Sequence, residues 1–111
     1  MRIDSKILAD GRVWTNGDEA HFNELSVTER LIVKEWIMKN FIKVSKLTCR
    51  QSSNSLRKYI IADRGIFLTN NQFKEAMLEC GFKPYYVEDV LWCFNISRRS
   101  PALQKGILPR G

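Results

Sequence analysis

The sequence predicts one helix-rich α+β domain with an N-terminal β-hairpin, three helices and short strands. Its length of 111 residues suits a single domain, and its hydrophobic content of 44% is ordinary for a globular chain. Apolar residues recur at helical spacing in some segments and alternate in others. We expect the compact domain to cover residues 1–96, and residues 97–111 to form a basic, loosely ordered tail because prolines, glycines and cations dominate there.

A turn signal predicts a β-hairpin within residues 1–22. Asp10-Gly11 lies between two short β-prone runs, residues 6–9 and 12–15. Both central residues of a tight hairpin turn must accept a positive φ angle, which Asp and Gly tolerate well.

The first predicted helix covers residues 27–44. Ser26 and Glu29 have the spacing of a capping box, in which each side chain satisfies a backbone N–H group of the other residue. Apolar side chains then recur at helical spacing, and this wide stripe makes the helix the expected centre of the core. The stripe consists of Ile32, Val33, Trp36, Ile37, Phe41 and Val44.

Two further helices are predicted by capping signals and periodicity. One covers residues 53–62 and is closed by Gly65. The other starts at Thr69 and ends before Gly81, which stands where a C-terminal glycine cap belongs.

The remaining segments are predicted to be extended or irregular. Residues 66–68 are too short for a helix and are typical of a strand, whereas residues 84–89 are typical of a turn. Residues 91–96 alternate apolar side chains and predict a final strand. The resulting mixture of helices and strands also fits a winged helix, although the order of the connections is unusual for that fold.

Positive charge is concentrated in two stretches of the chain. Residues 41–74 carry seven Lys or Arg against one acid, and residues 97–111 carry four against none. The other two stretches are net acidic, and the whole chain has a formal charge of +6. Because the charge is segregated rather than uniform, it indicates a surface that meets polyanions.

No residue pattern is typical of a catalytic, metal or cofactor site. His21 is the only histidine and lies in an acidic, turn-rich segment. The cysteines Cys49, Cys80 and Cys93 lack metal-binding spacing, and their odd number argues against a disulfide framework. The sequence also lacks a signal-peptide pattern and an apolar run near the roughly 18 residues of a membrane span. We therefore expect a non-enzymatic protein without cofactor, metal or membrane contact.

One part of the chain resembles a known group of proteins. The sequence LTNNQFKEAML, two residues and GF occupy residues 68–82, preceded by SLRK at 55–58 and followed by LWCFNI at 91–96. This pattern, over residues 45–96, resembles small, largely uncharacterised proteins carried by phages and mobile elements of Gram-positive bacteria. The resemblance implies a genetic setting rather than a particular activity. Together with the missing signal-peptide pattern, it leads us to expect the protein in the cytoplasm of the bacterial host.

The basic segment, residues 43–58, is the strongest indication of function. Cations and small polar groups around the start of a helix can contact phosphates and reach base edges. A solvated basic face without a partner, or a contact with an acidic protein surface, are the alternatives. The candidate residues for binding nucleic acid or another partner are Lys43, Lys46, Arg50, Ser53, Asn54, Arg57 and Lys58, with Arg98 and Arg99 from the tail.

Two functions follow from these observations, beside the less specific alternative of a structural or accessory virion protein. The first is a nucleic-acid-binding protein, for DNA or RNA, that serves a phage or mobile element. The second is an anti-CRISPR-type inhibitor that binds a host RNA-guided nuclease or its guide RNA, as the small size and phage-like resemblance suggest. A homodimer is compatible with either, because the edge of an exposed hairpin invites pairing.

Overall fold

The computed structural model describes residues 6–7, 13–14, 20–86 and 90–104. Within these residues the chain is a compact, helix-rich α+β domain with four α-helices and short antiparallel strand pairs. The elements are, in order, β1 (Lys6–Ile7), β2 (Val13–Trp14), the 3-10 helix η1 (Phe22–Glu24), α1 (Val27–Asn40), α2 (Ser53–Arg64), α3 (Asn70–Glu79), β3 (Pro84–Tyr85), β4 (Cys93–Phe94) and α4 (Pro101–Gln104).

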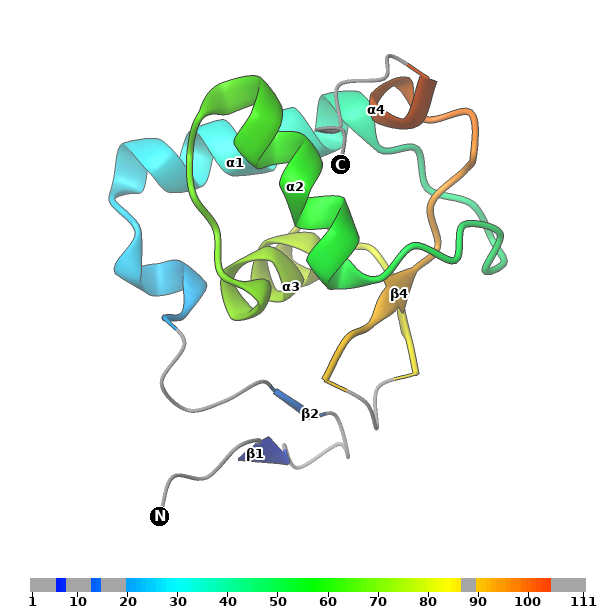
Figure 1. The fold of residues 1–111 in the computed structure, drawn as a ribbon, viewed down its shortest axis with the longest axis horizontal. Coiled ribbons are helices and arrows are strands. Elements are labelled where there is room, and N and C mark those ends of the chain that lie inside the picture. The colour runs from blue at the N-terminus through cyan, green and yellow to red at the C-terminus, as the bar shows by residue number, and fades with distance from the viewer. Residues whose placement is uncertain (1–5, 8–12, 15–19, 87–89, 105–111) are drawn as a thin grey trace.

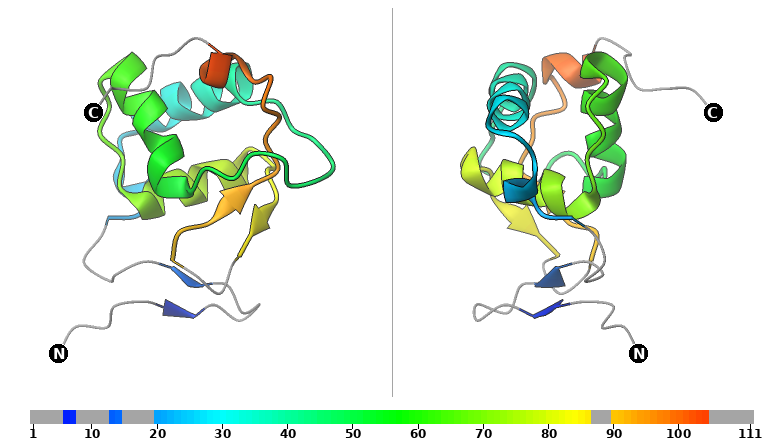
Figure 2. Two further views of the ribbon diagram at one scale, coloured as in Figure 1. Left: turned by 45° about the vertical axis from the view of Figure 1, so that its right-hand side comes forward. Right: turned by 90° about the vertical axis from the view of Figure 1, so that its left-hand side faces the viewer.

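The helices α1 and α2 form two walls that are joined by α3. Figure 2 shows α1 and α2 on opposite sides, with the short helix α4 between them at one end and α3 at the other. In agreement, α3 contacts α1, α2 and η1, and α4 contacts α1. The β3–β4 pair continues from the α3 end of this frame (Figure 1). The helix α3 is therefore the central element of the core, where α1 was expected.

Aromatic rings fill the space between the walls. The ring of Phe41 packs edge-to-face against Trp36 at 5.3 Å and against Phe73 at 6.3 Å, measured between ring centroids. Phe73 in turn meets Phe94 of β4 at 6.2 Å. Edge-to-face pairs add stabilisation of about 0.5–1.5 kcal/mol each beyond the buried area. These contacts link α1, α3 and β4 into one core.

The helix α1 begins as predicted and ends earlier. The Ser26 hydroxyl accepts a hydrogen bond from the Glu29 N–H at 3.1 Å, which confirms the capping box. The predicted end at residue 44 is wrong, because Phe41 is already extended. The following residues pair instead with the segment after β4, through an antiparallel bridge between Lys43 and Ile96. Long-range pairing thus overrides a helical pattern that the sequence continues.

The capping signals of α2 and α3 are confirmed. Gly65, at the end of α2, and Gly81, just after α3, have φ angles of 71° and 86°. The left-handed conformation of both residues favours glycine. The hydroxyl of Thr69 accepts from the Gln72 N–H at 3.1 Å, and the Gln72 side chain accepts in return from the Thr69 N–H at 3.0 Å.

The extended segments differ from prediction in two places. Residues 66–68 form no strand, because no described strand lies beside them; the Leu68 carbonyl accepts instead from the guanidinium of Arg57 at 2.7 Å. The segment predicted as a turn contains β3, in which Pro84 pairs with Phe94. The final strand is present but shorter than predicted, and its alternating side chains Trp92, Phe94 and Ile96 are fully buried.

The two ends of the chain are described only in part. Residues 101–104, expected in a loosely ordered tail, form α4. Ser100 just before it is buried, and its hydroxyl accepts a hydrogen bond from the Ile42 N–H at 2.8 Å. Residues 105–111 lie outside the described residues. In the N-terminal segment Ile7 pairs with Val13, and the predicted turn at Asp10-Gly11 lies outside them as well.

Two phenylalanines provide a matched test of this core. Phe73 is fully buried, whereas Phe67 is 66% exposed and contacts the guanidinium of Arg57 at 5.6 Å. We expect Phe73→Ala to lower the free energy of unfolding by about 3–5 kcal/mol, because it leaves a cavity. Phe67→Ala should change it by less than about 1 kcal/mol. Urea denaturation followed by circular dichroism measures both, and equal losses would contradict the placement of α3 in the core.

Candidate nucleic-acid interface

The candidate site is built around the connection between α1 and α2. We call residues 42–52 the basic loop. The loop lies beside the segment that follows β4, as Figure 1 shows. Its attachment is a pair of hydrogen bonds to Asn95: the Val44 N–H donates to the Asn95 carbonyl at 3.0 Å, and the Asn95 amide donates to the Val44 carbonyl at 2.8 Å. A residue that sequence reasoning did not single out therefore holds the loop.

The same attachment brings the cations after β4 to the basic loop. The Arg98 guanidinium donates to the Thr48 carbonyl at 2.9 Å, and the Thr48 hydroxyl donates to the Ile96 carbonyl at 2.9 Å. The Ser97 N–H donates to the Ile42 carbonyl at 2.8 Å. Residues that are about fifty positions apart in the sequence thus share one surface.

Asn95 also attaches the residues before β3. Its side-chain oxygen accepts from the Lys83 N–H at 2.7 Å, so Lys83 lies beside the loop as well. The ammonium of Lys83 lies 5.4 Å from the ring centre of Tyr85. The ammonium of Lys43 lies 5.2 Å from the ring centre of Phe82, in the space that a side chain at Gly81 would need.

Tyr86 adds an aromatic ring to this surface, next to the cation Arg50. The Arg50 guanidinium donates to the Tyr86 hydroxyl at 2.8 Å, and both side chains are exposed. Tyr86 has a φ angle of 61°, the only positive value at a non-glycine residue in the described part of the chain. A bulky residue seldom adopts this conformation, so the contacts around it must stabilise it.

We define the basic face as six exposed cations: Lys43, Lys46, Arg50, Lys83, Arg98 and Arg99. Within the described ranges none of them forms an ion pair; the ion pairs there join His21 to Glu75 and Lys34 to Glu79. The described acids belong to η1, α1, α2 and α3, and none lies in the segments that make the basic face. The structure thus brings five of the predicted cations together on one surface, with Lys83 as a sixth that was not predicted.

The predicted residues at the start of α2 are placed differently. Ser53 is fully buried: its hydroxyl donates to Asn70 at 2.6 Å, so it is not available to a partner. Asn54 accepts from Arg57 at 2.9 Å, and Arg57 is further held by the Leu68 carbonyl. Lys58 is exposed on α2. Within residues 20–86 and 90–104, no hydrogen bond joins the side chains of this group to a cation of the basic face.

Lys74 is one of the seven cations counted in residues 41–74, but it does not contribute to the surface charge. Its side chain is fully buried, and its ammonium lies 4.2 Å from the ring centre of Trp92 and donates to the Val90 carbonyl. An ammonium over an aromatic face is stabilised by the negative charge of that face. One of the seven cations in residues 41–74 therefore belongs to the core.

The thiols of Cys80 and Cys93 favour their neutral form. Burial raises the pKa of the Cys80 thiol above its usual range, and also that of Cys93, where the nearby thiol of Cys49 raises it further and Arg50 opposes the rise. A raised pKa leaves little thiolate at neutral pH, and the thiolate is the nucleophile and metal ligand. No group of His, Cys, Asp and Glu that could hold a metal ion occurs in residues 6–7, 13–14, 20–86 and 90–104.

Compared with known protein families, curated proteins and solved structures, the chain matches none. In the part of the chain that the structure describes, no helix has the length and apolar character needed to cross a membrane.

Asn95 offers a direct test of how the basic face is assembled. Asn95→Ala removes the acceptor of the Lys83 N–H and the donor to the Val44 carbonyl. We expect amide hydrogen exchange at Lys83 to accelerate by roughly tenfold, since a lost hydrogen bond of about 1 kcal/mol or more lowers the cost of local opening. Exchange measured by NMR should change little at Ile60, which is buried in α2. Unaltered protection of Lys83 would contradict the attachment.

Proposed function

We propose that this protein is a non-enzymatic nucleic-acid-binding protein of a phage or mobile element, acting in the cytoplasm of its bacterial host. The contact is made by the basic face with the phosphate backbone. The observation that carries the proposal is the meeting of the basic loop, Lys83 and residues 98–99 on one surface, without a described acid among them. Such a surface attracts a polyanion through the release of its counterions.

The cations on this face are suited to phosphate contact. Exposed Lys and Arg side chains there have no carboxylate partner in the described ranges, so a phosphate does not have to displace one. Arg50 and Arg98 each use one nitrogen for an internal hydrogen bond, which orients the guanidinium and leaves other donors free. An oriented guanidinium loses less freedom when it binds a phosphate.

A winged-helix arrangement agrees with part of the element order. In this chain α2 and α3 are followed by the β3–β4 pair, and in a winged helix two helices are likewise followed by a two-stranded wing. In that fold the second helix of the pair enters the major groove, but α3 is largely buried and its more exposed charged residues are Glu75 and Glu79. We therefore propose contact through the basic face rather than through α3.

Tyr85 and Tyr86 favour an unpaired strand over a duplex. Tyr86 is exposed next to Arg50, and Tyr85 is half-buried next to Lys83. Bases of single strands stack on such rings with about 1–3 kcal/mol each, and the bases of a duplex are not free to do so. The neighbouring cations would hold the backbone of the same strand.

The proposal is tested by fluorescence anisotropy with labelled single-stranded RNA and duplex DNA, each at two salt concentrations. We expect binding that weakens steeply with salt and is tighter for the single strand. Absence of binding to both nucleic acids at low salt would overturn the proposal.

Two double variants with the same loss of charge locate the contact. Lys46→Gln with Arg50→Gln removes two cations of the basic face and should weaken RNA binding by about tenfold or more. The slope of affinity against salt should decrease by about 1.4, because two phosphate contacts are lost. Lys39→Gln with Arg64→Gln is the control: both cations are exposed and line a separate depression of about 240 Å³ that also contains Glu35. Equal effects of the two variants would show that only net charge matters.

Tyr86 separates stacking from charge. Tyr86→Ala should weaken binding of single-stranded RNA by roughly fivefold to a hundredfold and affect duplex binding much less. Tyr86→Phe keeps the ring and loses only the hydrogen bond from Arg50, so it should retain most of the affinity. An alanine variant that affects RNA and duplex equally would contradict stacking.

An anti-CRISPR-type inhibitor remains the second candidate. The basic face favours contact with guide RNA or an acidic protein surface, since a plug that imitates nucleic acid would be acidic. This function replaces the first if the unchanged protein inhibits an RNA-guided host nuclease but binds no free nucleic acid. The Lys46 and Arg50 double variant should then lose the inhibition.

A further inference from the structure

A small depression of about 240 Å³ lies where the second half of α1 meets the end of α2. The residues from α1 recur at helical spacing, so they share one face of that helix, and Arg64 is the last residue of α2. Pockets for drug-sized ligands measure roughly 300–1,000 Å³, so this depression suits a smaller molecule. Its lining consists of Ile32, Glu35, Trp36, Lys39, Asn40 and Arg64.

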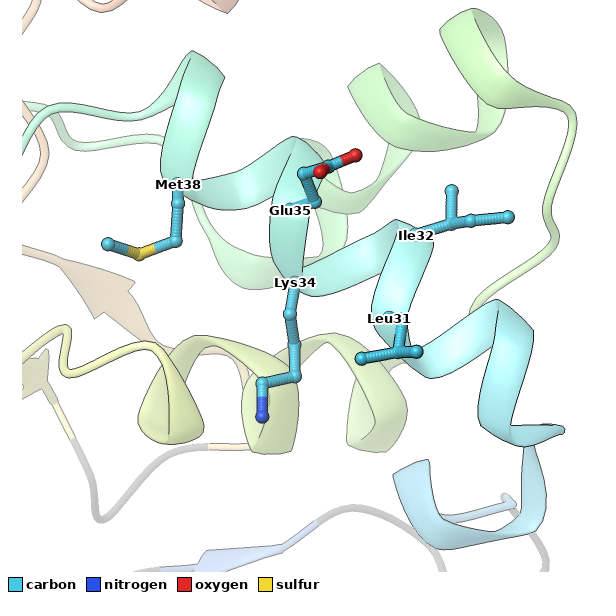
Figure 3. Close-up of a pocket in the computed structure, with 5 residues that line it drawn as sticks. All are labelled: Leu31, Ile32, Lys34, Glu35 and Met38. Carbon is cyan, nitrogen blue, oxygen red and sulfur yellow. The ribbon is translucent and has the colours of Figure 1, made fainter.

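The depression lies apart from the exposed apolar side chains of α1. Figure 3 shows Ile32 and Glu35 on one side of α1, and Leu31, Lys34 and Met38 on the other. Only the first two of these side chains line the depression beside α2. Most of the lining is polar, which disfavours a ligand with a large apolar body.

The floor of the depression is held in place by hydrogen bonds. Trp36 and Asn40 are only 5% and 8% exposed. The Trp36 indole N–H donates to the Asp63 carboxylate at 2.6 Å, which ties the last turn of α2 to α1. The Asn40 amide donates to the Trp36 carbonyl at 2.9 Å, whereas its side-chain oxygen accepts no hydrogen bond from residues 20–86 or 90–104. A fixed acceptor of this kind can receive a donor from a bound molecule without first losing another.

The rim of the depression carries three exposed charges that do not pair with one another. Glu35 and Lys39 are four residues apart, the spacing at which an acid and a base on a helix usually pair. Yet neither they nor Arg64 form an ion pair within the described ranges. A charged molecule that enters the depression therefore does not have to break an existing pair.

The charges define the ligand that would complement them. Two cations and one acid call for two carboxylates and one ammonium group, and an acidic amino acid carries this set on a small skeleton. A guanidinium such as that of Arg64 binds a carboxylate through two parallel hydrogen bonds, and Lys39 can hold the second carboxylate as a point charge. Glu35 and the Asn40 oxygen are acceptors for the ammonium group, which the negative ends of the two helices also favour.

We infer that this depression binds a free acidic amino acid, with Arg64 and Lys39 on its two carboxylates and with Glu35 and the Asn40 side-chain oxygen on its ammonium group. The site shares no residue with the basic face, and the inference does not depend on the proposed function.

The test is a titration of the full chain with L-glutamate and L-aspartate, followed by NMR at the Trp36 indole N–H and the Lys39 amide. We expect saturable shifts with a dissociation constant of about 1 mM or tighter for at least one of them. Glutarate lacks the ammonium group and L-glutamine lacks the second carboxylate, so each should bind about tenfold more weakly. Absence of saturable shifts in the millimolar range, or equal binding of glutarate and L-glutamate, would overturn the inference.

Variants of exposed residues separate the depression from net charge. Lys39→Gln with Arg64→Gln should weaken binding by about tenfold or more. Lys46→Gln with Arg50→Gln removes the same charge elsewhere and should bind as the unchanged protein does. Glu35→Gln should weaken binding of L-glutamate but not of glutarate. Binding that survives the loss of Lys39 and Arg64, or that both double variants lose equally, would contradict the assignment to this depression.

Discussion

The hydroxyl of buried Ser53 is the point on which the architecture depends. It donates to Asn70 at the start of α3 and accepts from the Trp92 N–H before β4 at 3.2 Å, while the Ser53 N–H donates to the Trp92 carbonyl. The starts of α2 and α3 and the segment before β4 meet there. Because unpaired polar groups in a core are costly, each of these segments can bury its backbone only when the other two are in place.

This junction explains which parts of the fold could be predicted from the sequence. Local signals were sufficient wherever the hydrogen bonds or the backbone conformation depend on one short segment alone. This holds for the capping boxes of Ser26 with Glu29 and of Thr69 with Gln72, and for the left-handed Gly65. They failed where partners are distant. The helix α1 stops before residue 44 because that segment pairs with Asn95, and Ser53 was taken for a surface residue because nothing near it in the sequence reveals Trp92 and Asn70.

The candidate site, too, could be predicted only in its local features. The cations of the basic loop could be named from charge alone, but their meeting with Arg98 and Lys83 depends on Thr48 and Asn95, whose roles appear only in three dimensions. Charge counting also included Lys74, which the fold places over Trp92. The polar side chains that assemble the basic face are uncharged, so a search for charged or catalytic residue types passes over them.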